Sequence, residues 1–199
     1  MKHILTLPIK NEDIEKLHIG DVIYVTGTIA TARDEGHARV VEEGVKPSID
    51  LNGGCVFHAG PIMKKNEKDE WVVVSVGPTT SMRMEKTEED FMEKTGVKLL
   101  IGKGGMGDKT ALACKKNKVI HTVIPGGCAV LEACMVEKVE GVDWLDLGMP
   151  EAFWILKVKE FGPLVVTIDI EGNNLFKDRR TEIGNNKELV LKDVKSKIK

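Results

Sequence analysis

Short apolar runs rich in valine and isoleucine recur along the whole chain, and glycine-rich turns separate them. Such runs are typical of β-strands, because β-branched side chains pack well on a pleated surface. We expect strands at residues 22–29, 56–59, 71–76, 98–101, 119–123, 153–157 and 164–168. Helices are expected between them at 34–43, 87–95 and 108–116, and residues 128–135 are compatible with another. This alternation predicts an α/β fold in which mixed sheets carry flanking helices.

The length and charge of the chain limit its organisation and its partners. Its 199 residues suit one domain, taken as residues 1–176, followed by a charged tail or terminal helix at 177–199. The formal net charge of −2 gives no bulk attraction to nucleic acid or to an acidic membrane. No stretch approaches the roughly 20 apolar residues that cross a bilayer, and the first residues lack a signal-peptide pattern. We therefore expect a cytoplasmic protein.

The segment TARDEGHARV, residues 31–40, follows an expected strand and combines basic residues with a histidine. On a helix that begins near Arg33, His37 lies one turn further along the same face. A guanidinium matches the geometry of a carboxylate, and an imidazole exchanges protons near neutral pH. A surface helix with a solvated charge pattern explains the same residues equally well.

The segment GPTTSMRM, residues 77–84, places three hydroxyls beside one cation. Thr79, Thr80, Ser81 and Arg83 follow a Gly-Pro turn, so this loop can surround an anion with hydroxyl, amide and guanidinium donors. The alternative is a hydroxyl-rich start of a helix with an incidental arginine.

The segment GKGGMG, residues 102–107, resembles a phosphate-binding loop only at first sight. Asp108 separates the last glycine from Lys109 and Thr110, which moves the lysine out of the P-loop register and adds a carboxylate. We therefore reject a nucleotide site. A flexible glycine loop that brings Lys103 and backbone amides close to a ligand fits better, and a simple turn with a solvated lysine is the alternative.

The cysteines show no spacing that would hold a metal or a cluster. Cys55, Cys114, Cys128 and Cys134 include no CxxC pair, so they make a poor zinc or iron–sulfur cage. Cys128 follows a Pro-Gly-Gly turn, where it could serve as a nucleophile or a ligand. We expect small buried thiols instead, in a reducing compartment.

Considered together, the segments that contain cations indicate a candidate shared binding site. Arg33, Arg83 and Lys103 come from three separate loops, and His37 and the threonine-rich loop accompany them. Loops at the carboxyl ends of strands in open α/β sheets meet around ligands. If these loops converge, they form a pocket for a small polyanion that also carries groups able to transfer protons.

In their order and spacing, TARDEGHARV, GPTTSMRM, GKGGMG and PGGC resemble the β subunit of class I (iron–sulfur) fumarate hydratase. The L(+)-tartrate dehydratase β subunit is similar, and the resemblance covers about residues 5–176. It implies a swivelling β/β/α domain and a partner α subunit that carries a [4Fe–4S] cluster, in an α2β2 assembly. The implied reaction is the reversible hydration of a small C4 dicarboxylate, fumarate, to (S)-malate.

The same resemblance implies roles for individual residues. Arg33, Arg83 and Lys103 match positions that hold the substrate carboxylates, and Thr80 and Ser81 belong to the same binding loop. Thr79 matches the proposed base, and His37 matches a catalytic position. No metal ligand is expected in this chain, because the cluster belongs to the partner.

Two alternatives stay open from the sequence alone. The substrate of a hydro-lyase subunit could be L(+)-tartrate instead of fumarate. The chain could also be a non-catalytic module that binds dicarboxylates or assembles a complex. Assays with a cluster-bearing partner separate these cases.

Overall fold

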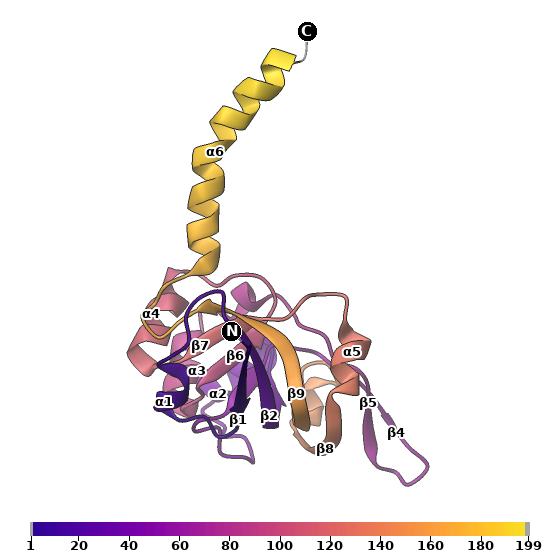
Figure 1. Ribbon diagram of the computed structural model, residues 1–199. Coiled ribbons are helices and arrows are strands. Elements are labelled where there is room, and N and C mark those ends of the chain that lie inside the picture. The colour runs from indigo at the N-terminus through magenta and orange to yellow at the C-terminus, as the bar shows by residue number, and fades with distance from the viewer. Residues whose placement is uncertain (1, 198–199) are drawn as a thin grey trace.

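The two longest apolar runs form the central strands, β2 (Val22–Thr31) and β9 (Phe153–Ile168). A computed structural model, which describes residues 2–197, pairs these two strands antiparallel along most of β2 (Figure 1). The expected strands 153–157 and 164–168 are one continuous strand. A Gly-Pro dipeptide, normally a turn signal, lies inside it at Gly162–Pro163.

The remaining strands extend this pair into a seven-stranded sheet with the order β1-β2-β3-β6-β7-β9-β8. Strands β1, β2, β3, β6 and β7 run parallel in that order, and β9 is antiparallel to its neighbours. Since β2 also pairs with β9, the strands β2, β3, β6, β7 and β9 close into a ring. The added bounds are β1 (Lys2–Thr6), β3 (Cys55–Phe57), β6 (Leu99–Gly102), β7 (Ile120–Val123) and β8 (Val136–Asp143).

Side chains alternate between two apolar cores, one on each face of the ring. One core contains Phe57, Ile101 and Trp154 from the strands, together with their alternate neighbours. The other contains Val56, Leu100 and Phe153, and it packs against residues of the helices α2 (Asp34–Val41), α3 (Glu88–Thr95) and α4 (Asp108–Asn117). Burial on both faces explains why these strands are almost uniformly apolar.

The expected mixed α/β architecture with flanking helices is confirmed, and the helices at 34–43, 87–95 and 108–116 correspond to α2, α3 and α4. The sequence analysis missed β1 and β8. Strand β8 lies at the end of the sheet order, and several of its residues are exposed. Its sequence, VEKVEGVD, therefore contains no continuous apolar run that would have predicted a strand. Thr87 precedes α3, but its hydroxyl donates to the carbonyl of Met84 instead of capping the helix.

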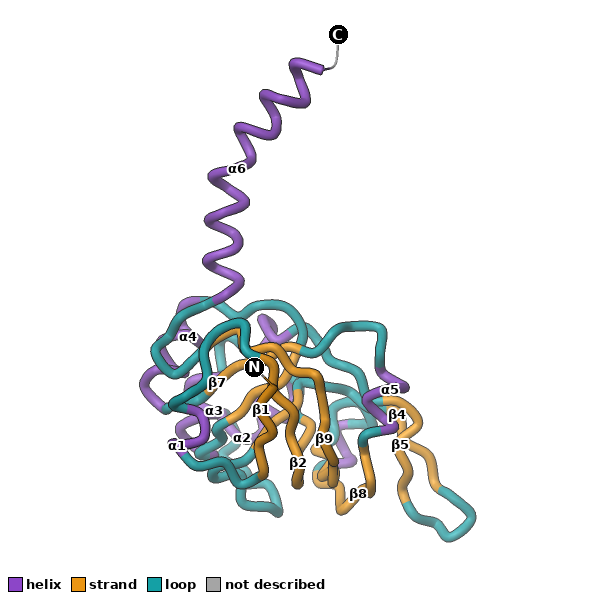
Figure 2. Tube along the Cα trace, viewed as in Figure 1, coloured by secondary structure: helices purple, strands orange, loops and turns teal. Residues whose placement is uncertain are grey.

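A separate hairpin is formed by β4 (Ile62–Lys65) and β5 (Trp71–Ser75), which project from the body (Figure 2). Short helical elements complete the body: α1 (Asn11–Ile14), η1 (Ser81–Met84), α5 (Ala129–Cys134) and η2 (Leu145–Leu147).

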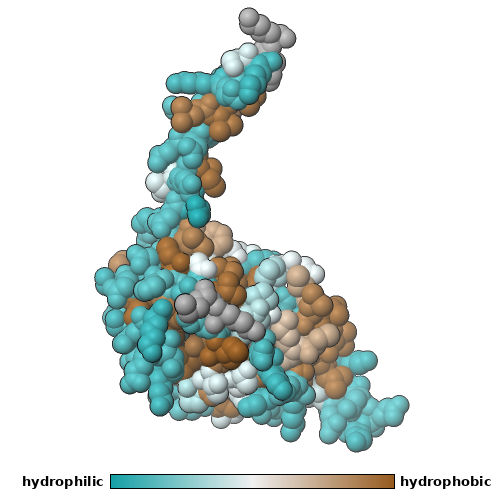
Figure 3. Space-filling view, in the orientation of Figure 1, coloured by the Kyte–Doolittle hydropathy of each residue, from teal (hydrophilic) through white to brown (hydrophobic). Residues whose placement is uncertain are grey.

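The C-terminal helix α6 (Leu175–Lys197) points away from the body as a single rod (Figures 1 and 2). None of its residues is buried. Its surface is mostly polar with scattered apolar residues such as Ile183 and Val190 (Figure 3). Among residues 2–197, no helix combines the length and the apolar character needed to cross a membrane.

Candidate active site

Most of the segments singled out in the sequence lie at the carboxyl ends of adjacent parallel strands. Arg33 and Asp34 follow β2, His58 follows β3, and Lys103 follows β6. These three strands are neighbours in the sheet, so their carboxyl ends lie side by side at one edge. The next strand, β7, leads into the Pro-Gly-Gly turn at the same edge, where a Cβ atom on Gly126 would lie 3.1 Å from Cδ of Lys103.

Backbone hydrogen bonds attach the hydroxyl loop to this edge. The amide of Thr79 donates to the carbonyl of His58 (2.7 Å). The amide of Lys103 donates to the carbonyl of Thr79 (3.2 Å), and the amide of Ser81 donates to the carbonyl of Lys103 (3.0 Å). Thr80 and Lys103 form a parallel β-bridge. The loop therefore extends the sheet locally, and its threonines are fixed relative to Lys103.

Arg83 connects this loop with the start of α2. Its Nε donates to Oδ1 of Asp34 (3.0 Å), and its Nη2 forms an ion pair with Oδ2 of the same carboxylate. Its Nη1 donates to the hydroxyl of Thr79 (3.4 Å). About half of the Arg83 side chain remains exposed (48%). The guanidinium is thus oriented by protein groups while part of it stays accessible to a ligand.

Arg33 is held more deeply beside the same helix start. Its Nη2 pairs with Oε1 of Glu151 (3.1 Å), and the side chain is 20% exposed. It passes Gly60 so closely that a Cβ atom there would lie 2.6 Å from Nη1. Its Nε atom is buried without a hydrogen-bond partner. A bound carboxylate would supply the acceptor that this buried donor lacks.

Lys103 contributes an exposed ammonium. Within residues 2–197, its side chain forms no hydrogen bond and no ion pair. Two of the three cations at this edge are paired with carboxylates, Arg83 with Asp34 and Arg33 with Glu151, whereas Lys103 is unpaired among the described residues. This surplus of positive charge suits an anionic ligand.

Two of the expected site residues have no exposed side-chain surface. His37 is fully buried on α2, stacked on Phe91 with ring centroids 4.1 Å apart. Ser81 is fully buried under the loop, within 3.1 Å of Nδ1 of His58. These two residues lie beneath the exposed cations, whereas Thr79 is half-buried and Thr80 is exposed.

A buried carboxylate joins the two histidines. Oε1 of Glu88 lies 3.5 Å from Nε2 of His37, and Oε2 lies 3.4 Å from Nε2 of His58. Burial by itself raises the pKa of Glu88, but its interactions with the adjacent His58 and His37 rings outweigh burial and hold the pKa well below its usual range. Glu88 is therefore an ionised carboxylate inside the protein.

A carboxylate of the protein, that of Glu85, binds the end of the glycine loop 102–107. The carboxylate of Glu85 accepts hydrogen bonds from the amide of Gly107 (2.7 Å) and from the amide and hydroxyl of Thr110 (3.2 and 2.7 Å). It occupies the start of α4, the position at which a phosphate-binding loop would hold its ligand. This contact supplies a structural reason, beyond the inserted Asp108, why the loop is not a nucleotide site.

The cysteines do not converge. Cys55 and Cys114 are buried in the two different cores, and burial raises the pKa of both thiols. Cys128 is half-buried and Cys134 is exposed, so the expectation of buried thiols is wrong for Cys134. Within residues 2–197, the one group of three or more clustered ligand-type side chains is His37, His58 and Glu88, which contains no cysteine. These residues do not fit an iron–sulfur cluster.

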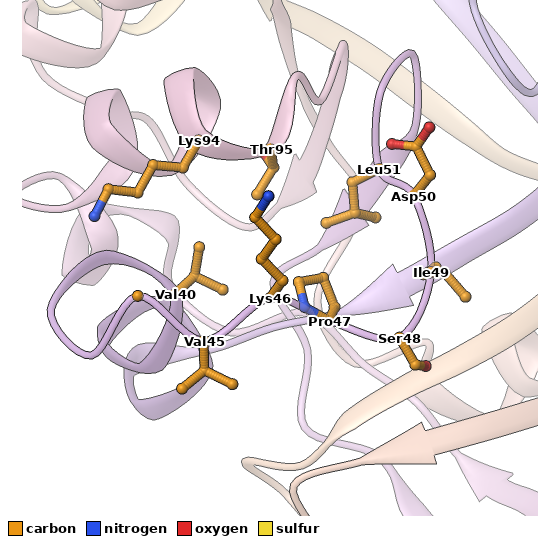
Figure 4. A pocket seen from close by; sticks show the side chains of 11 residues that line it. Val40, Val45, Lys46, Pro47, Ser48, Ile49, Asp50, Leu51, Lys94 and Thr95 are labelled. Atoms are coloured by element: carbon orange, nitrogen blue, oxygen red, sulfur yellow. The ribbon is translucent and has the colours of Figure 1, made fainter.

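A groove of about 510 Å³ lies at the opposite ends of α2 and α3 (Figure 4). Val40, Val45 and Leu51 form its apolar wall, and Lys46 and Lys94 reach over it. None of the expected site residues lines it. The edge described above, which carries those residues, is therefore the better candidate for chemistry.

Comparison with known proteins decides the family. A family model described as "Fumarase C-terminus" matches residues 2–179. This chain belongs to the fumarase C-terminus family. Among known proteins, the chain is similar to the L(+)-tartrate dehydratase subunit beta of Escherichia coli (strain K12), with 52% identity over 98% of this chain and 96% of that protein.

Two further relatives differ in the length of the protein that contains the matching region. A Methanocaldococcus jannaschii protein, provisionally named L(+)-tartrate dehydratase subunit beta, is 46% identical over 84% of this chain and 87% of its own length. A Geobacillus stearothermophilus protein, provisionally named fumarate hydratase class I, is 43% identical over 89% of this chain. The match spans only 34% of that longer protein. The family resemblance seen in the sequence motifs is thereby confirmed.

Several residues that build this edge were not predicted as site residues from the sequence. The structure adds Asp34, Gly60, Gly102, Glu151 and the buried pair His58 and Glu88. Asp34 lies inside a segment already singled out, and a single acidic residue beside two arginines was the available hint. His58 and Glu88 belong to ordinary-looking stretches, and only their contacts reveal them.

Proposed function

We propose that this chain is the β subunit of a hydro-lyase and that it binds the carboxylates of a C4 dicarboxylate at the edge formed by Arg33, Arg83 and Lys103. The observation that carries the proposal is the arrangement of Arg83, which is oriented by Asp34, touches Thr79 and remains half exposed. The family membership and the hydratase and dehydratase names of the relatives support it.

The proposed chemistry uses cations where negative charge develops. Removal of a proton from the carbon next to a carboxylate spreads negative charge onto that carboxylate. A guanidinium and an ammonium fixed beside it stabilise this charge more in the transition state than in the ground state. The site therefore lowers the barrier without rearranging at the moment of reaction.

Thr79 is the group proposed to lie closest to the carbon that loses its proton. A neutral threonine is a weak base, so it needs a neighbour that stabilises its deprotonated oxygen. Arg83 Nη1 donates to this oxygen at 3.4 Å, which provides such a neighbour. Thr80 is placed on the same loop beside Lys103 and completes the binding surface.

We further propose that the [4Fe–4S] cluster is carried by a partner α subunit in an α2β2 assembly in the cytoplasm. The four cysteines of this chain are unpaired and dispersed, so they supply neither a cluster cage nor a disulfide. The word "subunit" in the relatives' names supports a partner chain. In this proposal the chain contributes binding and proton-transfer groups to a site shared with that subunit.

L(+)-tartrate and fumarate are both candidate substrates. Identity of 52% over nearly the full length to a tartrate dehydratase subunit favours tartrate. The motif resemblance and the 43% identity to a fumarate hydratase favour the interconversion of fumarate and (S)-malate. Because both substrates present two carboxylates, the same three cations serve either of them.

The test is co-expression with cluster-bearing α subunits, followed by anaerobic assays with L(+)-tartrate and with (S)-malate. We expect turnover by the complex and none by this chain alone. Arg83→Ala should abolish turnover while the complex still assembles. Arg39→Ala is the matched control, since Arg39 lies on α2 and pairs with Asp146 outside the candidate site.

Near-normal turnover by the Arg83→Ala complex would remove Arg83 from the site and end the proposal in this form. Dicarboxylate binding without turnover in any complex would instead favour the non-catalytic module. The ratio of the two substrates' kcat/KM values identifies the physiological reaction class.

A further inference from the structure

Four polar atoms meet inside the protein without a conventional hydrogen bond between them. They are Nε2 of His37, Nε2 of His58 and the two carboxylate oxygens of Glu88, and all are buried. The three side chains have no exposed surface. Their separations of 3.4 and 3.5 Å are longer than a usual charge-assisted hydrogen bond, which is about 2.7–2.9 Å. Buried polar groups in such a cluster need an explanation.

The other ring nitrogen of His37 determines which protons the cluster contains. Nδ1 of His37 lies 2.9 Å from the carbonyl oxygen of Arg33. A carbonyl only accepts, so Nδ1 must carry a proton. If Nε2 carried none, its lone pair would face the ionised carboxylate of Glu88. His37 is therefore protonated on both nitrogens, and its positive charge is balanced by Glu88.

The carboxylate of Glu88 also orients the ring of His58. Its Nε2 faces the second oxygen of Glu88, so this nitrogen carries a proton and donates toward the carboxylate. The other ring nitrogen, Nδ1, then carries no proton and accepts a hydrogen bond from the hydroxyl of Ser81, whose oxygen lies 3.1 Å away. The hydroxyl of Ser81 is held in one direction, and the loop that bears Thr79 and Thr80 is held with it.

We propose that Glu88 is a positioning residue: it keeps His37 doubly protonated and, through His58, fixes Ser81 beneath the substrate-binding loop. Through the contacts of Glu88 with His37 and His58, the network connects the start of α3 with the first turn of α2 and with the end of β3. The network acts on the candidate site at two points. One is Arg33, whose carbonyl binds His37, and the other is Ser81, which begins the short helix that contains Arg83. The catalytic part of this inference rests on the proposed function, whereas the charge state does not.

The surroundings contain few competing charges. Phe91 covers one face of His37. The buried thiol of Cys114 lies close enough for Glu88 to raise its pKa. His121, 6.4 Å from His58 between ring centroids, has its pKa lowered to about 3, chiefly by burial, so it stays neutral. His37 is thus the one member of this buried histidine group for which the contacts require a positive charge.

The first experiment is ¹⁵N nuclear magnetic resonance of the full chain with labelled histidine, at neutral pH. We expect His37 to show two protonated nitrogens and His121 to show one, which serves as an internal reference. In Glu88→Gln, His37 should lose its second proton. A neutral His37 in the wild-type chain would overturn the inference, whether or not the variant folds and whatever the protein catalyses.

The second experiment measures turnover of the αβ complex. Glu88→Gln should lower kcat about 10- to 100-fold, the loss expected when a reacting group is slightly misplaced, and should leave KM within about threefold. Ser81→Ala should also lower kcat while His37 keeps both protons. Glu89→Gln is the control, because that neighbouring carboxylate binds Lys116 at the surface.

Three outcomes would refute this role. Unchanged kcat in folded Glu88→Gln or Ser81→Ala complexes would show that the network does not position the loop. An equal loss in Glu89→Gln would show a general effect of charge on α3. One metal ion released per chain on unfolding would show that His37, His58 and Glu88 bind a cation instead of sharing protons. Absence of turnover in the wild-type complex would count against the proposed function and leave the resonance result intact.

Discussion

The carboxylate of Asp34 binds two nitrogens of the Arg83 guanidinium, Nε and Nη2, and this contact joins the start of α2 to η1. The pair is partly exposed, at 31% for Asp34 and 48% for Arg83. Exposed ion pairs stabilise folded proteins little, by roughly 0–1 kcal/mol. Its importance should therefore lie in orienting Arg83.

Replacement of Asp34 tests this orientation. We expect Asp34→Asn to lower kcat/KM of the complex about tenfold or more, because the guanidinium loses its fixed direction. The free energy of unfolding should change by less than about 1 kcal/mol. Steady-state kinetics and urea unfolding measure the two effects. Asp146→Asn, which breaks the Arg39 ion pair on the same helix, should leave the kinetics unchanged.

Gly102 is required because it packs directly against Ser81. A Cβ atom at Gly102 would overlap the hydroxyl oxygen of Ser81 and would lie 3.2 Å from Nδ1 of His58. We expect Gly102→Ala to destabilise the protein by about 1–3 kcal/mol, the usual cost of overpacking a core. Urea unfolding at equilibrium provides the measurement.

A double variant identifies the clash as the cause. Adding Ser81→Ala removes the overlapping oxygen, so Gly102→Ala should cost less in that background than in the wild type. Gly184→Ala, in open space on α6, is the control and should be neutral or slightly stabilising. Equal costs in both backgrounds would assign the destabilisation to another contact.

His121 should make stability depend on pH. Burial lowers its pKa to about 3, with a further decrease from His58 and an increase from Glu88, and Nδ1 lies 2.6 Å from the hydroxyl of Thr167. The unfolded chain binds a proton at this histidine below about pH 6.5, whereas the folded chain does not. The unfolded state therefore gains stability as pH falls from about 6.5 toward about 3, by up to about 1.4 kcal/mol per pH unit.

The measurement is urea unfolding at several pH values between 7 and 5, compared with His121→Asn. The variant should lose less stability over this range than the wild type, because its side chain does not titrate. His18→Asn changes an exposed histidine and should retain the wild-type slope. Parallel wild-type and His121→Asn curves would contradict the assignment.

The four thiols should differ in reactivity in the order of their exposure. Cys134 is exposed and Cys128 half-buried, whereas Cys55 and Cys114 are buried with raised pKa values. Since the thiolate is the reactive form, an alkylating reagent should modify Cys134 first, Cys128 more slowly, and the other two only after unfolding. Mass spectrometry of peptides at timed intervals gives the order, and early labelling of Cys114 would show that its core opens.

Helix α6 should be dispensable for folding of the body. No residue of the helix is buried, and Phe176, near its start, is the residue that packs against the Gly105 backbone. Removal of residues 181–199 should change the free energy of unfolding by less than about 1 kcal/mol, as expected for surface changes. A larger loss would mean that the domain extends beyond residue 176, contrary to the boundary expected from the sequence.

Local features of this protein could be predicted from near neighbours in the chain. Val- and Ile-rich runs predicted most strands, and the segments between them predicted α2, α3 and α4. The positions of Arg33, Arg83 and Lys103 after strands were readable for the same reason, since each lies in a short segment of unusual composition. Edge strand β8 lacked such a run and was missed.

The way in which these elements meet could not be predicted from local patterns. Closure of the ring through β2 and β9 depends on pairing between distant strands, which no local pattern specifies. Folding buries His37 beside Glu88 and brings in His58, whose neighbours in the sequence gave no sign of a site. The physical reason is that burial, charge balance and hydrogen-bond partners are properties of the packed interior, where residues far apart in sequence replace water as neighbours.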